Sequence, residues 1–482
     1  MIGSKLSTRN SKFALAIAVG LASTSCGGGG GGGGSTGGGN VATAPIFTSG
    51  SSVSVQENEA GTFYTATASD PQGDTVIISI QGGADASKFV LEGSGNLRFS
   101  TPPNYDLPID ANQDNTYQVI LRATAGTDTT DLPLSIQVQN DKEGISATRV
   151  ATGFVDPVAM STLFDGQRLI IAENGGRIAE IDGNTGSVTE RDDIEAGLLP
   201  GEIISMAYAG RNKIFIDGIY FLTHSPTGGL SLQIYNPANG RFNFRTIGAV
   251  STEEVTGALF RGDDGHLFAA IGDPGGTRAQ DGASAYGKVW SSFDYDPYAG
   301  ASFPGNPTVF VSIIADGIGE PTGGTAISGR NLIADRGATV EDEITAFESD
   351  WDPIDFGWPF YEGYAEVASS PPPLLNGPTL TYRRGDARRE GLGIVGGRLY
   401  SGAIASIADH YVFGDVNGTI WSIPWSVFND GFRHDASDLE IRTLDFAPDV
   451  GKIDSPIAFE MTPENVLYIL DSDGEVFRVD QS

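Results

Sequence analysis

Acidic and amide side chains in the first third of the chain have spacings that suit a hard metal cation. Asp110, Asn112 and Asp114 alternate along one short segment, and alternating oxygen ligands of this kind can wrap a calcium ion. The segment is not an EF-hand, because Leu121 stands where that loop requires a bidentate Glu. Further acids lie at the ends of expected strands: Glu57, Asp70, Asp74 and Asp106. These residues predict calcium binding, and the alternative is a calcium-free domain with polar turns.

Other kinds of site find little support in the sequence. The 4 His residues are far apart and show no HxxxH or HxH spacing, so a zinc site is not expected. No GxSxG elbow, Walker loop or GxGxxG motif before a helix is present. The balance of 29 basic and 61 acidic residues gives a formal net charge of −32. Such a field repels nucleic acid and attracts divalent cations, although it also serves solubility.

The acids of the first region must be positioned by short strands. In residues 44–143, apolar and polar residues alternate in runs such as VSVQ, FYTATA and VIISI. Gly, Asp and Pro clusters separate these runs, which predicts a small antiparallel β-sandwich with the acids in its turns.

Residues 144–482 repeat one pattern, an apolar strand, a Gly/Asp turn and a second apolar strand. It occurs in RLIIAENGGRIAEIDGNTG, KIFIDGIYFLTHSPTGGLSLQIYNPANG, HLFAAIGDPGG, NLIADRGATVEDEITAF, HYVFGDVNGTIWSIP and NVLYILDSDGEVFRVD. Six such units predict a six-bladed β-propeller, and the whole chain is therefore expected to be all-β. Propellers carry their ligand sites on loops at one end of the central channel, so a site here should draw residues from several blades.

The N-terminus has the composition of an export signal. Basic residues precede an apolar run at residues 13–22, and Cys26, the only cysteine, follows small residues. Residues 1–26 are similar to a bacterial lipoprotein signal, which implies acylation of Cys26 and attachment to the cell envelope. The Gly-rich residues 27–43 suit a flexible tether. The alternative is cleavage without acylation and secretion.

The first domain resembles a bacterial cadherin-type repeat in the segments VQEN, SDPQGD, PPNYDLP and DANQDN. The resemblance implies a Greek-key sandwich that binds calcium through Glu57, Asp106 and acidic groups near its ends. Two features depart from the family. Ala125 stands where the repeat normally has Asp, and this chain has a single repeat, whereas cadherin calcium ions usually lie between repeats.

The second domain resembles the glucose/sorbosone dehydrogenase family. The similarity lies in VATGFVDPVAMSTLFDGQRLIIAENGGRI, ALFRGDDGHLFAAIGDPGG, RGATVEDEITAFESDWDPIDFGWPFYEGY and IVGGRLYSGAIASIADHYVFGDVNGTIW. Members are six-bladed propellers that use pyrroloquinoline quinone (PQQ) and calcium to oxidise sugars. The resemblance implies that backbone carbonyls of Gly337 and Ala338 hold the catalytic calcium. A second, structural calcium would use Glu343, the carbonyl of Phe356, and Glu366.

The residues expected to perform the oxidation differ from the family pattern. Glu254 occupies the position of the catalytic His, and Gly319 and Glu320 replace an Arg-Asn pair that clamps the quinone carboxylates. Lys452 is the only cation where the family has a late arginine pair. An added carboxylate would repel a tricarboxylate cofactor.

Two functions follow from these observations. The first is a calcium-binding, non-catalytic binding or adhesion protein for glycans, sugars or protein partners, held at the membrane by a lipid. The alternative is a PQQ- and calcium-dependent sugar dehydrogenase with Glu254 as its base, and a plain structural spacer is a third possibility. A dehydrogenase needs cations at the channel mouth, and the candidates are Arg330, Arg383, Arg384, Arg388 and Arg389.

Overall fold

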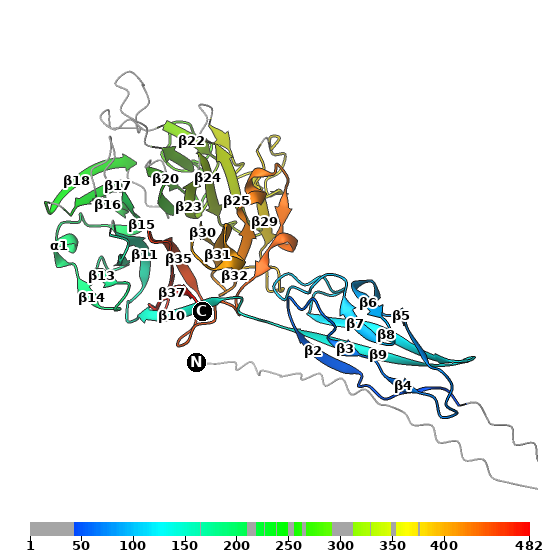
Figure 1. Ribbon diagram of the computed structural model, residues 1–482. Coiled ribbons are helices and arrows are strands. Elements are labelled where there is room, and N and C mark those ends of the chain that lie inside the picture. The colour runs from blue at the N-terminus through cyan, green and yellow to red at the C-terminus, as the bar shows by residue number, and fades with distance from the viewer. Residues whose placement is uncertain are drawn as a thin grey trace, which may run out of the picture.

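The computed structural model describes residues 43–163, 165–209, 218–225, 227–237, 239–248, 255–262, 267–291, 312–327, 329–348, 353–374 and 376–482. An elongated β-sandwich is followed by a ring of β-sheets, and the sandwich projects from the ring, which it meets at one end (Figure 1). Cys26, the Gly-rich tether and Glu254 fall outside the described residues. Within the described part, no helix is long and apolar enough to span a membrane.

Residues 46–139 form the sandwich, whose two main sheets have the strand orders β2-β9-β8-β5 and β3-β7-β6, with a small β1-β4 sheet beside them. Every second residue of β8 is buried, so one face of the strand points into the core around Leu97, Tyr117 and Leu134. The strands are β1 (Ile46–Phe47), β2 (Ser52–Gln56), β3 (Tyr64–Thr65), β4 (Ala68–Ser69), β5 (Ile77–Gly82), β6 (Phe89–Glu92), β7 (Asn96–Phe99), β8 (Thr116–Ala125) and β9 (Asp128–Gln139).

Six sheets follow, one for each blade of a propeller. The first three blades consist of β11 (Pro157–Thr162), β12 (Arg168–Glu173), β13 (Ile178–Asp182) and β14 (Val188–Glu190); β15 (Glu202–Ala209), β16 (Gly218–Ser225), β17 (Gly229–Asn236) and β18 (Arg241–Gly248); and β19 (Gly257–Arg261), β20 (Leu267–Ile271), β21 (Lys288–Ser291), β22 (Ser312–Asp316) and β26 (Ile354–Asp355).

The last three blades consist of β23 (Pro321–Ile327), β24 (Arg330–Asp335), β25 (Glu341–Glu348), β29 (Leu380–Arg383) and β33 (His434–Asp435); β30 (Ile394–Leu399), β31 (His410–Asp415), β32 (Ile420–Pro424) and β34 (Glu440–Ile441); and β35 (Pro456–Met461), β36 (Leu467–Asp471), β37 (Val476–Gln481) and β10 (Ile145–Ala151). The remaining elements are β27 (Tyr361–Glu362), β28 (Ala365–Glu366), the one-turn α1 (Asp192–Glu195), and the 3₁₀ turns η1 (Ala86–Lys88), η2 (Ala405–Ile407), η3 (Trp425–Asn429) and η4 (Ala436–Asp438).

The first strand of each blade lies innermost. Each of β11, β15, β19, β23, β30 and β35 contacts the next in this order, and β35 contacts β11. The ring is closed by β10, which pairs antiparallel with β37 at the far end of the chain. The expected all-β propeller with six blades is therefore confirmed.

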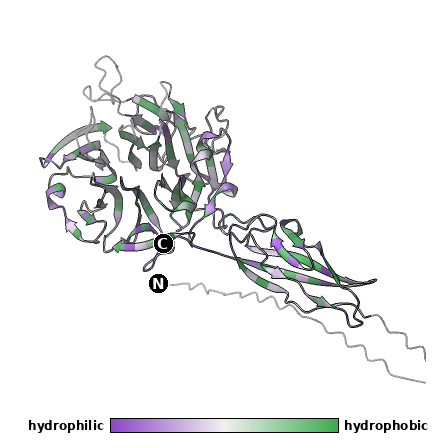
Figure 2. Cartoon of the chain, viewed as in Figure 1, coloured by the Kyte–Doolittle hydropathy of each residue, from purple (hydrophilic) through white to green (hydrophobic). Residues whose placement is uncertain are grey.

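The repeated units of the sequence correspond to the blades one by one. The turn DSDG joins β36 to β37, and DVNG joins β31 to β32, as hairpin signals predict. Gly418 in the second turn has φ +89°, and a Cβ there would lie 2.9 Å from the backbone of Asp454. Strand β36 (LYILD) is buried along its whole length because a neighbouring strand lies on each side and a neighbouring blade on each face. Figure 2 shows hydrophobic residues along the strands of both parts.

The closing strand pair gives a test of the ring. Val479 on β37 faces Ala147 on β10 and is 2% exposed, whereas Val450 is 52% exposed. We expect Val479→Ala to lower the free energy of unfolding by roughly 1–3 kcal/mol, because it removes buried methyl groups and leaves a cavity. Val450→Ala is the matched control and should change it by less than about 0.5 kcal/mol. Chemical denaturation measures both, and equal effects would contradict the closure.

Candidate functional site

A small cavity lies at the amino end of the inner strand β23, the end of the channel at which the sequence predicts the cofactor. It has about 40 Å³ of space for water-sized occupants. Since one water needs roughly 10–15 Å³ of such space, the cavity has room for an ion and a few waters. The lining residues are Pro274, Gly317, Gly319, Glu320, Asp335, Arg336, Gly337, Ala338, Glu341, Glu343, Phe356, Trp358, Tyr361, Glu362 and Gly363.

Backbone amides hold the carboxylates of this cavity in place. Asp335 at the end of β24 accepts from the amides of Gly319 (2.9 Å) and Glu320 (2.5 Å). Glu343 on β25 accepts from the amide of Gly363 at 2.7 Å. Glu362 accepts from the amides of Thr339 (2.8 Å) and Val340 (2.6 Å). These hydrogen bonds attach the loops around β23, β24 and β25 to the carboxylates that line the cavity.

The cavity holds more negative than positive charge. Burial raises the pKa of Asp335 to about 7. Burial, and then the charge of Asp335, raise the pKa of Glu343 well above its ordinary value. Arg336 is the lining residue with a positive charge, and it pairs with Glu320 at 2.7 Å. A bound cation would neutralise part of the negative charge that Arg336 leaves unbalanced, and it would favour the ionised form of each acid.

Arg384 lies beside this cavity and donates a hydrogen bond to one of the predicted calcium ligands, the carbonyl of Gly337. Its Nη1 donates to the carbonyl of Gly337 (2.8 Å) and to Oδ1 of Asp342 (2.9 Å). Asp342 is fully buried, and burial raises its pKa to about 6 although Arg384 opposes the shift. The Gly337 carbonyl, expected from the resemblance to bind calcium, thus already accepts a hydrogen bond from a guanidinium.

Four of the five predicted calcium ligands of the propeller line this cavity together: Gly337, Ala338, Glu343 and Phe356. Glu366 does not, since it lies exposed on β28. The carboxylate that this loop directs to the cavity is Glu362, which is buried. Sequence reasoning missed Glu362 and Asp335. The available signals were the Glu within WPFYEGY and the Asp that ends an apolar strand.

The arginines considered as replacement cofactor clamps lie elsewhere. Arg330 pairs with Glu348, and Arg383 is exposed. Arg388 donates to the carbonyl of Gln113 in the sandwich, and Arg389 donates to the carbonyls of Ala436 and Leu439. Among these candidates only Arg384 approaches the cavity.

Three of the six acids predicted as calcium ligands in the sandwich, Asp70, Asp110 and Asp114, bind backbone amides of their own turns. Asp110 accepts from the amides of Asp114 (2.9 Å) and Asn115 (3.2 Å), and Asp114 accepts from the side chain of Asn112 (2.8 Å). Asp70 accepts in the same way from the amides of Gln72 and Asp74. These oxygens shape the turns, and the structure does not bring them together at one point.

Glu57 and Asp106 lie at the end of the sandwich that meets the propeller. Glu57 accepts from the amides of Tyr105 (2.8 Å) and Asp141 (2.7 Å). Burial raises the pKa of Asp106 to about 9, against the opposing charge of Arg442. Among the described residues, Asp106, Glu143 and Asp445 form one of two acidic groups with oxygens within 4.8 Å of one another. The other comprises Asp471 and Asp473, at the end of β36 and the turn after it, and Asp454, which lies just before β35.

A second, larger cavity of about 550 Å³ lies at the opposite, carboxyl end of the inner strands. Its wall includes Arg398, which bonds Glu460 at 2.7 Å, and Thr162, whose hydroxyl donates to the same carboxylate at 3.3 Å. Glu460 on this wall is therefore paired with a cation, in contrast to most acids of the acidic cavity.

Asp335 in the acidic cavity and Asp342 beside it make stability depend on pH in a definite direction. Asp335 and Asp342 have folded-state pKa values of about 7 and about 6, above the ordinary value of 3.8. The folded protein therefore holds these protons more tightly than the unfolded chain. In chelator, we expect their contribution, on the order of a few kcal/mol, to be full below about pH 4 and lost as the pH rises through about 7.

Thermal unfolding between pH 4 and 8 in excess EDTA measures this dependence. Asp335→Asn should flatten the slope, and Asp386→Asn, at an exposed carboxyl of the same propeller, is the matched control. Stability that rises with pH over this interval would contradict the assignment.

Comparison with known proteins supports the fold. No protein-family model and no curated protein matches the chain. Among solved structures, the chain is similar to a glucose dehydrogenase at 18% identity, with 70% of this chain and 100% of that chain covered and a TM-score of 0.50. The soluble aldose sugar dehydrogenase from Escherichia coli in the apo-form matches at 16% identity, with 70% and 100% covered and a TM-score of 0.51. The propeller thus has the fold of the soluble glucose and aldose sugar dehydrogenases, and at this identity the likeness concerns the fold alone.

Proposed function

We propose that this protein is an exported, membrane-tethered calcium-binding protein whose sugar-dehydrogenase-like propeller engages glycans or protein partners without oxidising them. The observation that carries the proposal is the excess of carboxylates over cations in the cavity beside β23. Five acids line it, against one arginine that already pairs with one of them: Glu320, Asp335, Glu341, Glu343 and Glu362.

Calcium fits this set of donors. The ion prefers carboxylate and carbonyl oxygens and completes its shell with water. Glu343 and Asp335 would supply carboxylates, and Phe356, which lines the cavity, would supply a carbonyl. The tight three-carboxylate groups lie elsewhere, but a site that uses backbone oxygens and water does not need three carboxylates in contact. The ion would neutralise buried charge and hold the loops around the cavity together.

The quinone cofactor does not fit the same residues. Gly319 stands where the family has a cationic clamp, and a Cβ there would lie 3.4 Å from the ring of Trp358. The amide of Gly319 donates to Asp335, and the neighbouring Glu320 adds a carboxylate. A tricarboxylate would therefore meet acids instead of arginines.

The proposed location rests on the sequence. The apolar run at residues 13–22, the following Cys26 and the Gly-rich residues 27–43 suit export, acylation and a flexible leash. On this basis the protein belongs to the cell envelope, and it would be secreted if Cys26 is not acylated.

The alternative function is a PQQ- and calcium-dependent sugar dehydrogenase with altered cofactor contacts. It is favoured by the fold shared with glucose dehydrogenase and by the presence of Gly337 and Ala338 in the cavity lining. Glu254 would be its base, and burial of that carboxylate would have to raise its pKa.

Isothermal titration of the chelator-stripped full-length protein separates the two functions. We expect calcium to bind and PQQ not to bind, with or without calcium. Calcium-dependent PQQ binding would overturn the proposal, and loss of sugar oxidation in Glu254→Gln would then support the dehydrogenase.

Paired variants locate the calcium site. Glu343→Gln should weaken calcium binding by at least about tenfold, since it removes a charged ligand from a buried site. Glu366→Gln makes the same chemical change at an exposed position and should leave the affinity unchanged. Equal losses in both variants, or none in Glu343→Gln, would rule out the cavity as the calcium site.

A further inference from the structure

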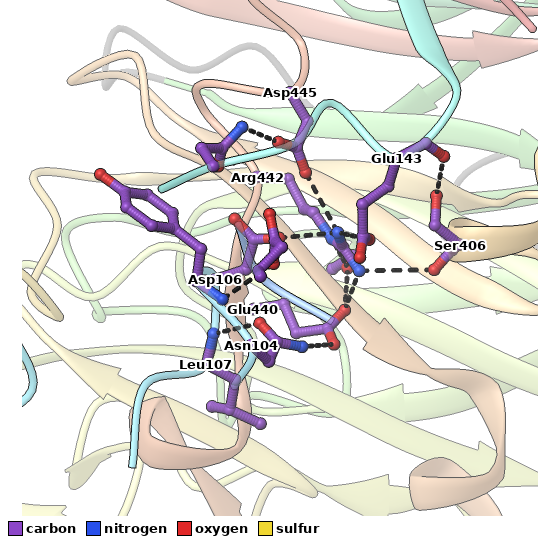
Figure 3. A network of polar contacts seen from close by, with 12 residues as sticks. Asn104, Asp106, Leu107, Glu143, Ser406, Glu440, Arg442 and Asp445 are labelled. Atoms are coloured by element: carbon purple, nitrogen blue, oxygen red, sulfur yellow. Dashed lines mark hydrogen bonds and ion pairs between the residues drawn. The ribbon is translucent and has the colours of Figure 1, made fainter. Parts of the chain in front are cut away.

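The sandwich and the propeller meet at a buried ionic joint. We define the joint as Asp106 of the sandwich, Glu143 of the linker, and Glu440, Arg442 and Asp445 of the propeller (Figure 3). Arg442 is 2% exposed, and Asp106 and Asp445 are fully buried. The four carboxylates of the joint all form ion pairs with the Arg442 guanidinium.

One nitrogen of Arg442 stands where a metal ion would stand. Asp106, Glu143 and Asp445 are a group whose oxygens could hold a cation. Arg442 Nη1 donates to Oδ2 of Asp106 at 2.7 Å and to Oδ2 of Asp445 at 3.0 Å, and it also bonds Oε2 of Glu143. The three carboxylates of this group therefore all surround the same protein nitrogen.

The other two nitrogens of the guanidinium also donate hydrogen bonds. Its Nη2 donates to Oε2 of Glu440 at 2.7 Å and to the carbonyl of Ser406 at 3.4 Å, and its Nε donates to the hydroxyl of Ser422 at 3.3 Å. An arginine keeps its charge at all physiological pH values and offers a rigid fork of donors. It can therefore serve as a permanent cation among carboxylates from three parts of the chain.

Neighbouring protein donors take up further oxygens at the joint. Asn140 donates to Oδ1 of Asp445 at 2.7 Å, and the amide of Ile441 donates to the carbonyl of Asp106 at 3.1 Å. Asn104 of the sandwich donates to Glu440 at 3.2 Å, and Lys142 of the linker donates to the carbonyl of Ala447 at 2.5 Å. Direct contacts of this kind hold the two domains without requiring a metal ion.

We infer that Arg442 replaces calcium as the cation that joins the sandwich to the propeller. The cadherin-type resemblance implies calcium at Glu57 and Asp106, but a guanidinium from the next domain occupies the group that includes Asp106. The orientation of the propeller on the sandwich is consequently independent of calcium. This inference does not rest on the calcium site proposed for the cavity beside β23.

The competing arrangement is a calcium ion bound beside Arg442. Two buried oxygens of this region, Oδ1 of Asp106 and Oδ1 of Asn140, have no hydrogen-bond donor. They are the atoms to which an additional ion would bind, and the experiment must separate this arrangement from the inferred one.

The test uses full-length protein that carries Glu343→Gln, so that the cavity beside β23 does not contribute. Small-angle X-ray scattering and protease cleavage at residues 140–144 are compared in calcium and in EDTA. With Arg442 intact, we expect the same scattering profile and the same cleavage rate in both. With Arg442→Gln, the carboxylates lose their cation, so cleavage in EDTA should accelerate on the order of tenfold or more, and calcium should restore protection. Arg442→Lys keeps a positive charge and should remain insensitive to calcium.

A change in scattering or cleavage on chelation with Arg442 intact would overturn the inference, as would an Arg442→Gln protein that stays protected in EDTA. If Arg442→Gln does not fold, the protein with intact Arg442 decides the matter alone. Failure of the proposed calcium function would appear separately, as unaltered calcium binding when Glu343→Gln is compared with the parent protein.

Discussion

The pairing of β10 with β37 is the interaction on which the rest of the structure depends. It joins the first strand after the linker to the last strand of the chain, and so turns a row of six sheets into a ring. A ring brings the six inner strands around one channel and gathers their terminal loops at its two ends. Because β10 follows the linker directly, the same pairing also decides where the sandwich meets the propeller. That position is beside the segment that carries Arg442 and Asp445.

Excess negative charge is the second constraint, and the two acidic centres meet it in different ways. At the joint, a guanidinium from the propeller lies among four carboxylates and is almost fully buried. In the cavity beside β23, the lining arginine is paired with Glu320, and burial raises the pKa of Asp335 and Glu343. A buried charge is expensive unless it is paired. At the joint the protein itself supplies the cation in the middle of the carboxylates, whereas the arginine that lines the cavity is paired with Glu320 and leaves the other lining acids without a cation among the lining residues.

Comparing the predicted and observed positions of individual residues shows which features a local sequence pattern can predict. The hairpin units predicted the blades because each blade is made mostly of consecutive strands, so its pattern is contained in a short stretch of sequence. Gly337, Ala338, Glu343 and Phe356 line one cavity, to which the turn before β25, β25 itself and the residue after β26 all contribute. Glu366 lies outside it, since the tight hairpin β27–β28 directs Glu362 inward and leaves Glu366 exposed. In the sandwich, the spacing of Asp110, Asn112 and Asp114 produced a turn in which each oxygen binds a local donor.

The sequence by itself determined the all-β class, the number of blades, the acidic character and the positions of the turns. These follow from period-two alternation, turn residues and composition, which act over a few residues at a time. Only the tertiary structure decided that Asp335 and Glu362 share a cavity, and that Arg442 lies against Asp106 across 336 positions of sequence. In such a contact, the residues around one partner in the sequence do not indicate which distant residue it will meet. Their meeting depends on ring closure and on the linker, which bring distant segments together only after the whole chain has folded.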